Sequence, residues 1–345
     1  MKNLKAILAT PGSMVFEESE MPVPGPGEVL IKVGRVGICG SDIHAFESGP
    51  FIPPKDPSTK IGLGHECSGV IVALGSGADA FREGDRVTIE PGVPCGKCRF
   101  CKEGRYNLCL EMDFMATSPR YRGALANYLT HPQSMTFKLP DGMDEVEGAL
   151  VEPAAVGMHA ALQANVRPGN KIAILGAGCI GLMTLQACRA LGASEIVAID
   201  LIPKRLEMAT RLGASAMVDA GTCDTVETVK ALLGSLGADI VFETAGSRAT
   251  AALAPSLVMR GGRIMIVGTI PGDTPINFLK INREVTIQTV FRYANRYPAT
   301  ISAIASGKID VKSMVTDTYK FSDVQRAFRE SVDRKNEIIK LVVSM

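Results

Sequence analysis

A short glycine-rich turn is the feature that most restricts how this chain can fold. The apolar run KIAIL (171–175) leads directly into GAGCIG (176–181), and the helical pattern LMTLQACRAL (182–191) follows. The next apolar run, EIVAI (195–199), ends at the acidic Asp200. A strand, a G-x-G-x-x-G turn, a helix and a second strand that ends in an acidic residue give the full context of a dinucleotide-binding fingerprint. The sequence therefore predicts a parallel α/β domain with a dinucleotide site at this turn.

Each glycine of the turn has its own physical role in this prediction. Gly176 permits the tight turn, Gly178 lets the backbone approach a pyrophosphate, and Gly181 allows the helix to pack closely on the strand. The free N–H groups at the start of the helix then face the anion. Cys179 and Ile180 stand between these glycines, so we expect them at the cofactor as well.

The acidic residue at the end of the second strand predicts which dinucleotide is bound. Asp200 can accept hydrogen bonds from the adenosine ribose and would repel a 2′-phosphate, which favours NAD over NADP. Arg205 follows in the next helix, where a guanidinium group could tolerate a phosphate. We therefore expect both residues at the cofactor, with NAD as the preferred form.

The pattern around this turn predicts a doubly wound sheet. Short apolar runs alternate with helical segments, one of which begins with Pro203 and ends at Gly213, as helices commonly do. Six runs are expected to form strands: 171–175, 195–199, 216–219, 239–244, 263–267 and 285–291. Helices are expected near 182–191, 203–212, 224–234 and 247–259. This alternation indicates a six-stranded parallel sheet of the Rossmann type.

The rest of the chain has a different pattern of apolar runs and turn residues. Its first part contains short β-type runs separated by glycine and proline, at 29–33, 69–74 and 86–90, which indicate mostly antiparallel β structure. Two helical patterns and a final strand end the chain, at 298–307, 323–334 and 338–343. A length of 345 residues is enough for two domains. We therefore predict a β-rich domain over 1–153, a dinucleotide-binding domain over 154–290, and a return of 291–345 to the first domain.

Composition limits the partners that this protein can have. The chain carries 37 basic and 36 acidic residues, a balance that argues against a surface built for nucleic acid or an anionic membrane. The first residues, MKNLKAILATPGS, lack the pattern of a signal peptide. No apolar run approaches the roughly 20 residues that a spanning helix needs. We therefore expect a cytoplasmic protein with a small-molecule substrate and with no nucleic-acid or membrane partner.

Four closely spaced cysteines predict a metal site in the β-rich domain. Cys95, Cys98, Cys101 and Cys109 follow the pattern C-x2-C-x2-C-x7-C in a lobe at 94–110. The chain has nine cysteines, an odd number, and without an export signal they are expected to be reduced rather than paired as disulfides. The run also lacks the proline that usually follows the fourth cysteine of an iron–sulfur site. Four thiolates complete the tetrahedral coordination of zinc, so we expect a structural zinc with no position left for a substrate.

A second candidate metal site combines different ligand types. Cys39 lies in the run GICGSD, and His65 and Glu66 are adjacent in the run GLGHE. Thiolate, imidazole and carboxylate groups are ligands that catalytic zinc accepts, with one position left open for water or substrate. Glu152, at the predicted junction of the two domains, could bind the metal directly or through a water molecule. The third protein ligand is therefore open between Glu66 and Glu152.

Taken together, these motifs resemble those of the zinc-dependent medium-chain dehydrogenases. Their order along the chain is GICGSD, GLGHE, the four-cysteine lobe, EPAAVGMHA (152–160), GAGCIG and VFRYANRYP (290–298). The last motif is similar to the polyol group, the sorbitol and xylitol dehydrogenases, rather than to ethanol-type or threonine-type relatives. This resemblance extends over essentially the full length. It implies a GroES-like catalytic domain, a Rossmann domain, one catalytic and one structural zinc, NAD, and assembly as a homotetramer.

The resemblance also implies roles for residues at the catalytic metal. Cys39, His65 and Glu66 would hold the zinc, and Glu152 would hold or replace the water bound to it. Ser41 matches the hydroxyl group that relays the proton of the substrate.

Further residues would surround the substrate. His44 is expected to lie close to the metal ligands without binding the metal itself. Phe114 and Thr117 match positions of the substrate pocket, and Arg292 and Tyr293 match residues beside the polyol chain and the cofactor.

The reaction implied by the resemblance is the NAD-dependent oxidation of a secondary alcohol of a polyol to the ketose. One alternative is another zinc alcohol dehydrogenase of the superfamily, which acts on threonine or on a sugar-alcohol phosphate. Arg120, Arg122 or Arg296 could bind such a phosphate. A second alternative is a non-catalytic NAD-binding protein of the same fold, and the complete set of catalytic ligand types argues against it.

Overall fold

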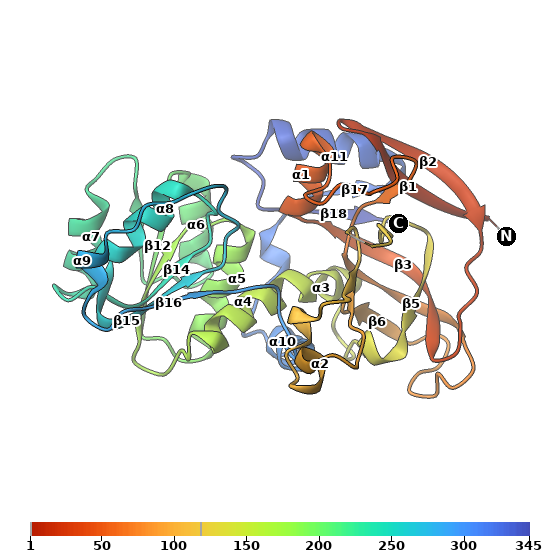
Figure 1. Ribbon diagram of the computed structural model, residues 1–345, viewed down its shortest axis with the longest axis horizontal. Coiled ribbons are helices and arrows are strands. Elements are labelled where there is room, and N and C mark those ends of the chain that lie inside the picture. The colour runs from red at the N-terminus through yellow and green to blue at the C-terminus, as the bar shows by residue number, and fades with distance from the viewer. Residues whose placement is uncertain (1, 118) are drawn as a thin grey trace. The chain divides into compact units, whose positions relative to one another are not determined.

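The computed structural model describes residues 2–117 and 119–345, and the chain divides into two compact units. Unit 1 contains the chain up to Glu152 together with Tyr297–Ala305 and Val311–Met345. Unit 2 contains Pro153–Arg296 and Ser306–Asp310. Figure 1 shows the elements of each unit along the chain. No helix among the described residues is both long enough and apolar enough to cross a membrane.

Unit 1 is built mainly from β-strands. Its largest sheet has the strand order β10-β6-β5-β3-β18-β17, and β9 also pairs with β3. These strands are β3 (Glu28–Ile38), β5 (Glu66–Leu74), β6 (Arg86–Ile89), β9 (Tyr128–Pro132), β10 (Thr136–Lys138), β17 (Val315–Lys320) and β18 (Lys340–Ser344). All neighbours pair antiparallel except β17 and β18, which are parallel. The expectation of a mostly antiparallel first part is therefore confirmed.

Smaller elements complete unit 1. A three-stranded sheet contains β2, β1 and β4, and a two-stranded sheet contains β7 and β8. Their bounds are β1 (Lys2–Thr10), β2 (Ser13–Glu20), β4 (Ile61–Gly62), β7 (Gly92–Val93) and β8 (Asp113–Phe114). The helices are α1 (Gly40–Ser48), α2 (Arg99–Lys102), α3 (Glu145–Ala149), α10 (Tyr297–Ala305) and α11 (Val324–Asp333).

The C-terminal segment is part of the core of unit 1. β18, drawn in blue in Figure 1, lies beside β3, drawn in red, with Leu341 opposite Ile38. α11 buries Val324, Ala327 and Phe328, a spacing that forms one apolar stripe on a helix. This stripe faces α1, which lies beside α11 in Figure 1. The ring of Phe46 in α1 is centred 5.3 Å from that of Phe328 in α11. The C-terminal elements thus pack against the segments that carry GICGSD and GLGHE.

Unit 2 contains a doubly wound parallel sheet. The strand order is β13-β12-β11-β14-β15-β16, and every neighbouring pair is parallel. The strands are β11 (Lys171–Leu175), β12 (Glu195–Asp200), β13 (Ala216–Asp219), β14 (Ala238–Glu243), β15 (Val258–Ile266) and β16 (Thr286–Thr289). The order reverses beside β11, which is the switch point where such sheets bind dinucleotides. The predicted Rossmann sheet of six strands is confirmed.

Helices connect the strands of unit 2. They are α4 (Val151–Gln163), which begins in unit 1, α5 (Cys179–Ala190), α6 (Pro203–Arg211), α7 (Thr225–Leu233), α8 (Arg248–Leu253) and α9 (Phe278–Ile281). The helix predicted over 247–259 is wrong in its length. A 3-10 turn at Ala254–Ser256 follows α8, and β15 begins at Val258. Pro255 ends the α-helix there, because proline has no N–H group to donate and its ring clashes with the preceding turn.

Candidate active site

Three potential metal ligands converge in unit 1. The thiol sulfur of Cys39, a ring nitrogen of His65 and a carboxylate oxygen of Glu66 all lie within 4.8 Å of one another. Cys39 stands between β3 and α1, and Glu66 is the first residue of β5. Because β3 and β5 pair with Gly37 opposite Glu66, the sheet itself brings the two ligand segments together. His65 and Glu66 are buried, whereas Cys39 is partly exposed.

The carboxylate of Asp42 bonds to both segments that carry the candidate metal ligands. The sequence analysis did not identify this residue. Its Oδ2 accepts a hydrogen bond from the N–H of Cys39 at 3.0 Å, and its Oδ1 accepts one from the N–H of Gly64 at 2.9 Å. Oδ1 also lies 3.7 Å from Nδ1 of His65, which is too long for a hydrogen bond but close enough for attraction between charges. Asp42 is the third residue of α1, a position whose side chain often reaches back to the N-cap, and that pattern could have identified it.

The electrostatics of this group favour a charged histidine and a charged carboxylate. Burial would lower the pKa of His65, but the carboxylate of Asp42 and the thiol of Cys39 raise this pKa well above its ordinary value. Burial would raise the pKa of Asp42, but His65 and the N–H groups of Gly64 and Cys39 lower it. A metal ion takes histidine in its neutral form, so metal binding here would release a proton.

The donor set fits a catalytic zinc. A thiolate, an imidazole and a carboxylate are the ligand types of such sites, and three protein ligands leave one position of a tetrahedron open. Glu152, the fourth candidate, is buried at the start of α4 and is not one of the three grouped ligands. Its charge raises the pKa of a neighbouring carboxyl group, that of Glu90.

Glu90 is a buried carboxyl group that the sequence analysis missed. Burial is the main cause that raises its pKa to about 7, and Glu152 adds to the shift. The hydroxyl of Tyr106 donates a hydrogen bond to Oε2 of Glu90 at 3.1 Å, and Nε2 of His131 lies 2.9 Å from the backbone oxygen of Glu90. No local pattern marks Glu90, because its burial depends on residues distant in the sequence.

Glu66 is paired with a lysine from the end of the chain. Nζ of Lys340 donates to Oε1 and Oε2 of Glu66 at 2.7 and 2.9 Å, and to the backbone oxygen of Ile38 at 3.0 Å. Both side chains are almost completely buried. The two residues are 274 positions apart, so a single sequence gives no signal of this contact.

One expected substrate residue, Phe114, lies near the metal ligands. The ring of Phe114 is centred 5.5 Å from the ring of His65 and is buried. Thr117 follows in the next turn, and its hydroxyl donates to the backbone oxygen of Phe114 at 3.0 Å. The structure therefore places an aromatic ring beside the imidazole of His65.

The other expected residues are distributed over both units. Ser41 and His44 belong to α1, which begins directly after Cys39, and the ring of His44 stacks on Phe51 at 3.8 Å between centroids. Arg292 and Tyr293 belong to unit 2. Arg292 has a left-handed backbone with a φ of 49°, and Tyr293 is buried.

The four cysteines of the lobe form a compact group of free thiols. The sulfur atoms of Cys98 and Cys101 are 3.5 Å apart, and those of Cys95 and Cys101 are 4.0 Å apart. A tetrahedron with zinc–sulfur bonds of about 2.3 Å has edges of about 3.8 Å, so these separations fit zinc and exclude disulfide bonds. Backbone N–H groups, that of Cys101 first, lower the pKa of Cys98 to about 6 and so favour a thiolate. Cys109 completes the group of four.

The glycine turn of unit 2 leaves space for a pyrophosphate. Gly176 has a φ of 98°, and a Cβ atom there would lie 2.7 Å from the backbone nitrogen of Ala245. A Cβ atom on Gly181 would collide with the backbone oxygen of Gly176. At Gly178, by contrast, no atom of the described residues beyond Gly178 itself and its two chain neighbours lies within 4 Å of the position of a Cβ atom. Cys179 and Ile180 begin α5 beside this open space and are partly exposed.

Asp200 has a structural contact in addition to its expected role at the ribose. Its Oδ2 accepts a hydrogen bond from the N–H of Ala177, inside the glycine turn, at 2.7 Å. Its Oδ1 accepts from the N–H groups of Leu201 and Ile202 at 2.8 and 3.0 Å. Nη1 of Arg205 lies 3.9 Å from Oδ2. Asp200 and Arg205 thus form an ion pair at the edge of the turn.

Comparison with known proteins identifies related families for both parts of the chain. The family described as "Alcohol dehydrogenase GroES-like domain" matches residues 25–141. The family described as "Zinc-binding dehydrogenase" matches residues 179–306.

Full-length relatives agree with these matches. A zinc-type alcohol dehydrogenase-like protein of Escherichia coli, YdjJ, is 66% identical over 100% of this chain and 99% of its own length. A sorbitol dehydrogenase of Bacillus subtilis is 42% identical, over 99% of this chain and 97% of its own length. A crystal structure of an Escherichia coli oxidoreductase of unknown specificity superimposes with a TM-score of 0.99 and 65% identity, over 100% of this chain and 99% of its own.

Proposed function

The chain belongs to the polyol group of the zinc-dependent medium-chain dehydrogenases, and on that premise we propose that it oxidises a secondary alcohol of a sugar alcohol to the ketose, with NAD as the acceptor. One observation carries the proposal. Cys39, His65 and Glu66 converge within 4.8 Å in a chain that aligns over nearly its full length with a sorbitol dehydrogenase.

The residues of unit 1 would bind the metal and the reacting alcohol. A zinc ion held by Cys39, His65 and Glu66 would act as a Lewis acid on the substrate oxygen and lower the pKa of the hydroxyl group. The carboxylate of Asp42, 3.7 Å from Nδ1 of His65, would help to orient the imidazole through attraction between charges. The hydroxyl of Ser41, on α1 next to Cys39, would take the proton of the substrate and pass it towards solvent.

The surroundings would orient the substrate. The ring of Phe114 beside that of His65 would offer an apolar surface that keeps water from that side of the reacting carbon. Glu152 would accept a hydrogen bond at the open position of the metal site, and Thr117, Arg292 and Tyr293 would bind hydroxyl groups further along the polyol.

The residues of unit 2 would hold NAD. NAD supplies the hydride acceptor, and the protein fixes the distance and the angle of transfer. The open space at Gly178 and the N-terminus of α5 would accept the pyrophosphate, and Asp200 would bind the ribose hydroxyls. Assembly as a homotetramer and a cytoplasmic location are further parts of the proposal, and light scattering of the purified protein tests the first.

A phosphorylated substrate has less support. Arg120 and Arg122, the cations considered for a phosphate, lie 3.4 and 2.8 Å from the carboxylate of Asp113. Arg296 donates through Nε to Nδ1 of His159 at 3.1 Å. All three guanidinium groups therefore already have partners within their own units.

A screen of NADH formation tests the proposed function. The zinc-loaded protein would be assayed with sorbitol, xylitol, ribitol, galactitol, a sugar-alcohol phosphate, threonine and ethanol. We expect the highest kcat/KM for an unphosphorylated polyol. Turnover of threonine, ethanol or the phosphate without turnover of any polyol would refute the assignment.

Two variants serve as controls for the screen. Cys39→Ser and His65→Ala should abolish NADH formation and remove the metal of this site, because each deletes a ligand. NAD binding, followed by calorimetry, should persist in both variants, since the fingerprint lies in unit 2.

A further inference from the structure

Tyr121 has a backbone conformation that a tyrosine rarely adopts. Its φ is 51°, in the left-handed region, and the residue is only 4% exposed. A bulky side chain crowds the backbone in this region, so glycine or asparagine is the usual residue there. The chain therefore keeps a tyrosine where its conformation is unfavourable, and strain of this kind is commonly found at functional sites.

The backbone of Tyr121 is fixed to the segment that leads into His65. The N–H of Gly62 donates to the backbone oxygen of Tyr121 at 2.8 Å. A Cβ atom on Gly62 would lie 2.5 Å from the nitrogen of Gly123, so the two backbones lie directly against each other. In addition, the N–H of Tyr121 donates to the backbone oxygen of Thr117 at 2.8 Å. These contacts hold the tyrosine in its left-handed conformation.

The side chain of Tyr121 joins this fixed segment to a loop at 50–55. Its hydroxyl donates to the backbone oxygen of Ile52 at 2.7 Å. Among the described residues, no other hydrogen bond joins the loop at 50–55 to the rest of the chain. Most residues of the loop are exposed, so packing holds it only weakly. The position of the loop therefore depends on the hydroxyl of one residue.

The loop and the fixed segment both lie next to the elements that carry the metal ligands. In the loop, the ring of Phe51 stacks on that of His44 at 3.8 Å between centroids, and His44 belongs to α1, which begins directly after Cys39. In the other segment, the ring of Phe114 is centred 5.5 Å from that of His65. The tyrosine hydroxyl thus joins two segments whose aromatic rings border the candidate active site.

A cavity leaves the segment around Tyr121 incompletely packed. Met115, Tyr121 and Leu125 are among the residues that line it, and its volume is about 380 Å³. Close packing on this side therefore does not determine where the aromatic ring lies. The hydrogen bond to Ile52 and the backbone contacts of Tyr121 supply the constraint instead.

From this geometry we propose that Tyr121 is a positioning residue for the substrate, because its hydroxyl holds the loop at 50–55, and with it Phe51, in the place that a bound alcohol requires. The inference rests on the proposed function, since it concerns the same active site. A loop that the substrate must order lowers the affinity, whereas a loop that is already held in place does not. Loss of the hydroxyl should therefore weaken substrate binding more than it slows the chemical step.

Tyr121→Phe tests the proposal, because it removes the hydroxyl and keeps the ring. We expect the KM for the preferred polyol to rise about three- to tenfold, the range that corresponds to one neutral hydrogen bond, while kcat changes by less than about twofold. The KM for NAD should not change, since the fingerprint lies in unit 2. Hydrogen exchange measured by mass spectrometry should become faster in the loop at 50–55 and stay unchanged in β5.

Two further substitutions serve as controls. Tyr121→Asn introduces a residue that tolerates the left-handed region but whose side chain is too short to reach Ile52. It should raise the KM at least as much as Tyr121→Phe, and it provides the measurement if the phenylalanine variant does not fold. Tyr128→Phe removes the hydroxyl of another tyrosine of unit 1, which has no hydrogen-bond partner among the described residues, and should change neither the KM nor the hydrogen exchange.

A double-mutant cycle tests whether Tyr121 acts through Phe51. In a Phe51→Ala background, Tyr121→Phe should change the KM for the polyol far less than in the wild type, because the ring that the hydroxyl positions is absent. An equal change in both backgrounds would overturn the inference.

The outcomes distinguish this inference from the proposed function. A wild-type KM in Tyr121→Phe or Tyr121→Asn, a fall in kcat without a rise in KM, or wild-type hydrogen exchange in the loop at 50–55 would overturn the role of Tyr121, even if the enzyme is a polyol dehydrogenase. If the wild-type protein oxidises no polyol, the proposed function fails instead, and the hydrogen-exchange comparison then decides whether the hydroxyl holds the loop.

Discussion

Glu90 is a residue whose ionisation connects the stability of the protein to pH. It is buried, and burial is the main cause that raises its pKa from the ordinary value of 4.5 to about 7. The folded state therefore holds the proton between these pH values, whereas the unfolded state has released it. By proton linkage, this group makes the protein less stable as the pH rises from 4.5 to 7.

Replacement of Glu90 by glutamine should remove this dependence. We expect Glu90→Gln to be more stable than the wild type at pH 8 by about 3 kcal/mol at most, and to differ little near pH 5. Urea unfolding of the zinc-loaded proteins at the two pH values measures the difference. Glu111→Gln, at an exposed carboxylate of the same unit, is the control and should show no such dependence. An equal effect of Glu90→Gln at both pH values would contradict the shifted pKa.

Asp200 is the residue from which the preference for NAD is expected, and its contacts determine how to test it. Because Oδ2 accepts a hydrogen bond from Ala177, Asp200→Ala would disturb the glycine turn as well as remove the charge. Asp200→Asn removes the charge but keeps an acceptor. We expect the ratio of kcat/KM for NAD to that for NADP to fall about 10-fold or more in both variants, with a larger loss of NAD binding in Asp200→Ala.

A neighbouring carboxylate supplies the control for this test. Asp219 ends β13 directly beside Asp200 in the parallel sheet. Asp219→Asn should leave the cofactor ratio nearly unchanged, because Asp219 does not contact the glycine turn. An unchanged ratio in both Asp200 variants would refute the assignment of Asp200 to the ribose.

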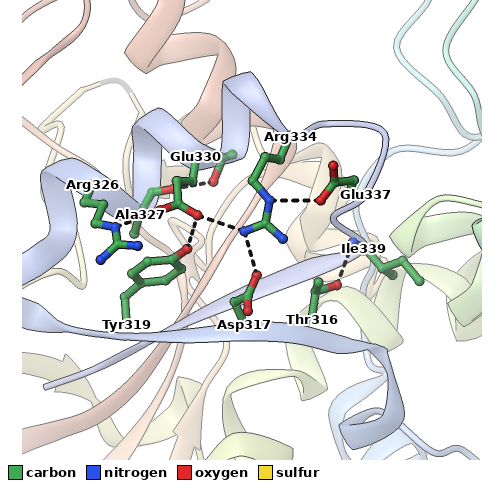
Figure 2. Close-up of polar contacts among 10 residues, drawn as sticks. Thr316, Asp317, Tyr319, Arg326, Ala327, Glu330, Arg334, Glu337 and Ile339 are labelled. Carbon is green, nitrogen blue, oxygen red and sulfur yellow. Dashed lines mark hydrogen bonds and ion pairs between the residues drawn. The ribbon is translucent and has the colours of Figure 1, made fainter.

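At the scale of elements, a network of ion pairs joins α11 to β17 (Figure 2). The carboxylate of Glu330 accepts hydrogen bonds from the hydroxyl of Tyr319 at 2.6 Å, from Nε of Arg326 at 2.7 Å and from Nη1 of Arg334 at 2.8 Å. Arg334 also contacts Asp317 of β17 at 3.1 Å. These hydrogen bonds lower the pKa of Glu330 to about 2.

The pKa of Glu330 is lowered, whereas the pKa of Glu90 is raised, so the two groups change stability with pH in opposite directions. A carboxyl group with a lowered pKa stabilises the fold above its unfolded pKa, here 4.5, and loses this contribution as the pH falls towards 2. Glu330→Gln should therefore be less stable than the wild type at pH 7, and the difference should shrink below about pH 4.5. Urea unfolding at pH 7 and pH 3.5 checks this. Asp333→Asn, at the end of the same helix, should give a difference that does not depend on pH in this way.

Elements also explain how much could be predicted from the sequence. The Rossmann sheet was predictable because its signals are local: KIAIL, GAGCIG and Asp200 lie close together along the chain. The helix over 247–259 was predicted too long because Pro255 and the first two residues of β15, Val258 and Met259, were assigned to it. Asp42 could have been identified from the sequence, because it is the third residue of the helix that follows the N-cap Cys39.

Contacts between distant segments could not be predicted in this way. Glu66 and Lys340 come from the start of β5 and the start of β18, and Glu152 affects the pKa of Glu90 from a distant segment of the chain. Their chemistry depends on burial and on strand pairing, neither of which is visible in one sequence. The motifs therefore identified the candidate ligands, whereas the structure revealed the partners that determine how these ligands behave.

At the scale of the whole molecule, the two metal sites should have separate effects on function and stability. The four-cysteine group has no free ligand position and organises a lobe with short elements, α2 and a 3-10 turn at Tyr106–Leu108. The group of Cys39, His65 and Glu66 lies instead at the end of β3 and the start of β5, two strands whose apolar side chains belong to a large core cluster. Loss of metal should therefore unfold the lobe but only inactivate the other site.

One matched pair of substitutions tests this separation. Cys98→Ser should lower the Tm by several degrees, because loss of a structural metal removes folding free energy, and turnover per folded molecule should change little. Cys39→Ser should abolish turnover and leave the Tm close to that of the wild type. Metal analysis should find about one zinc per chain in each variant and about two in the wild type. A Cys98→Ser protein with the Tm of the wild type, or a Cys39→Ser protein that still oxidises the polyol, would show that the two sites have been assigned the wrong roles.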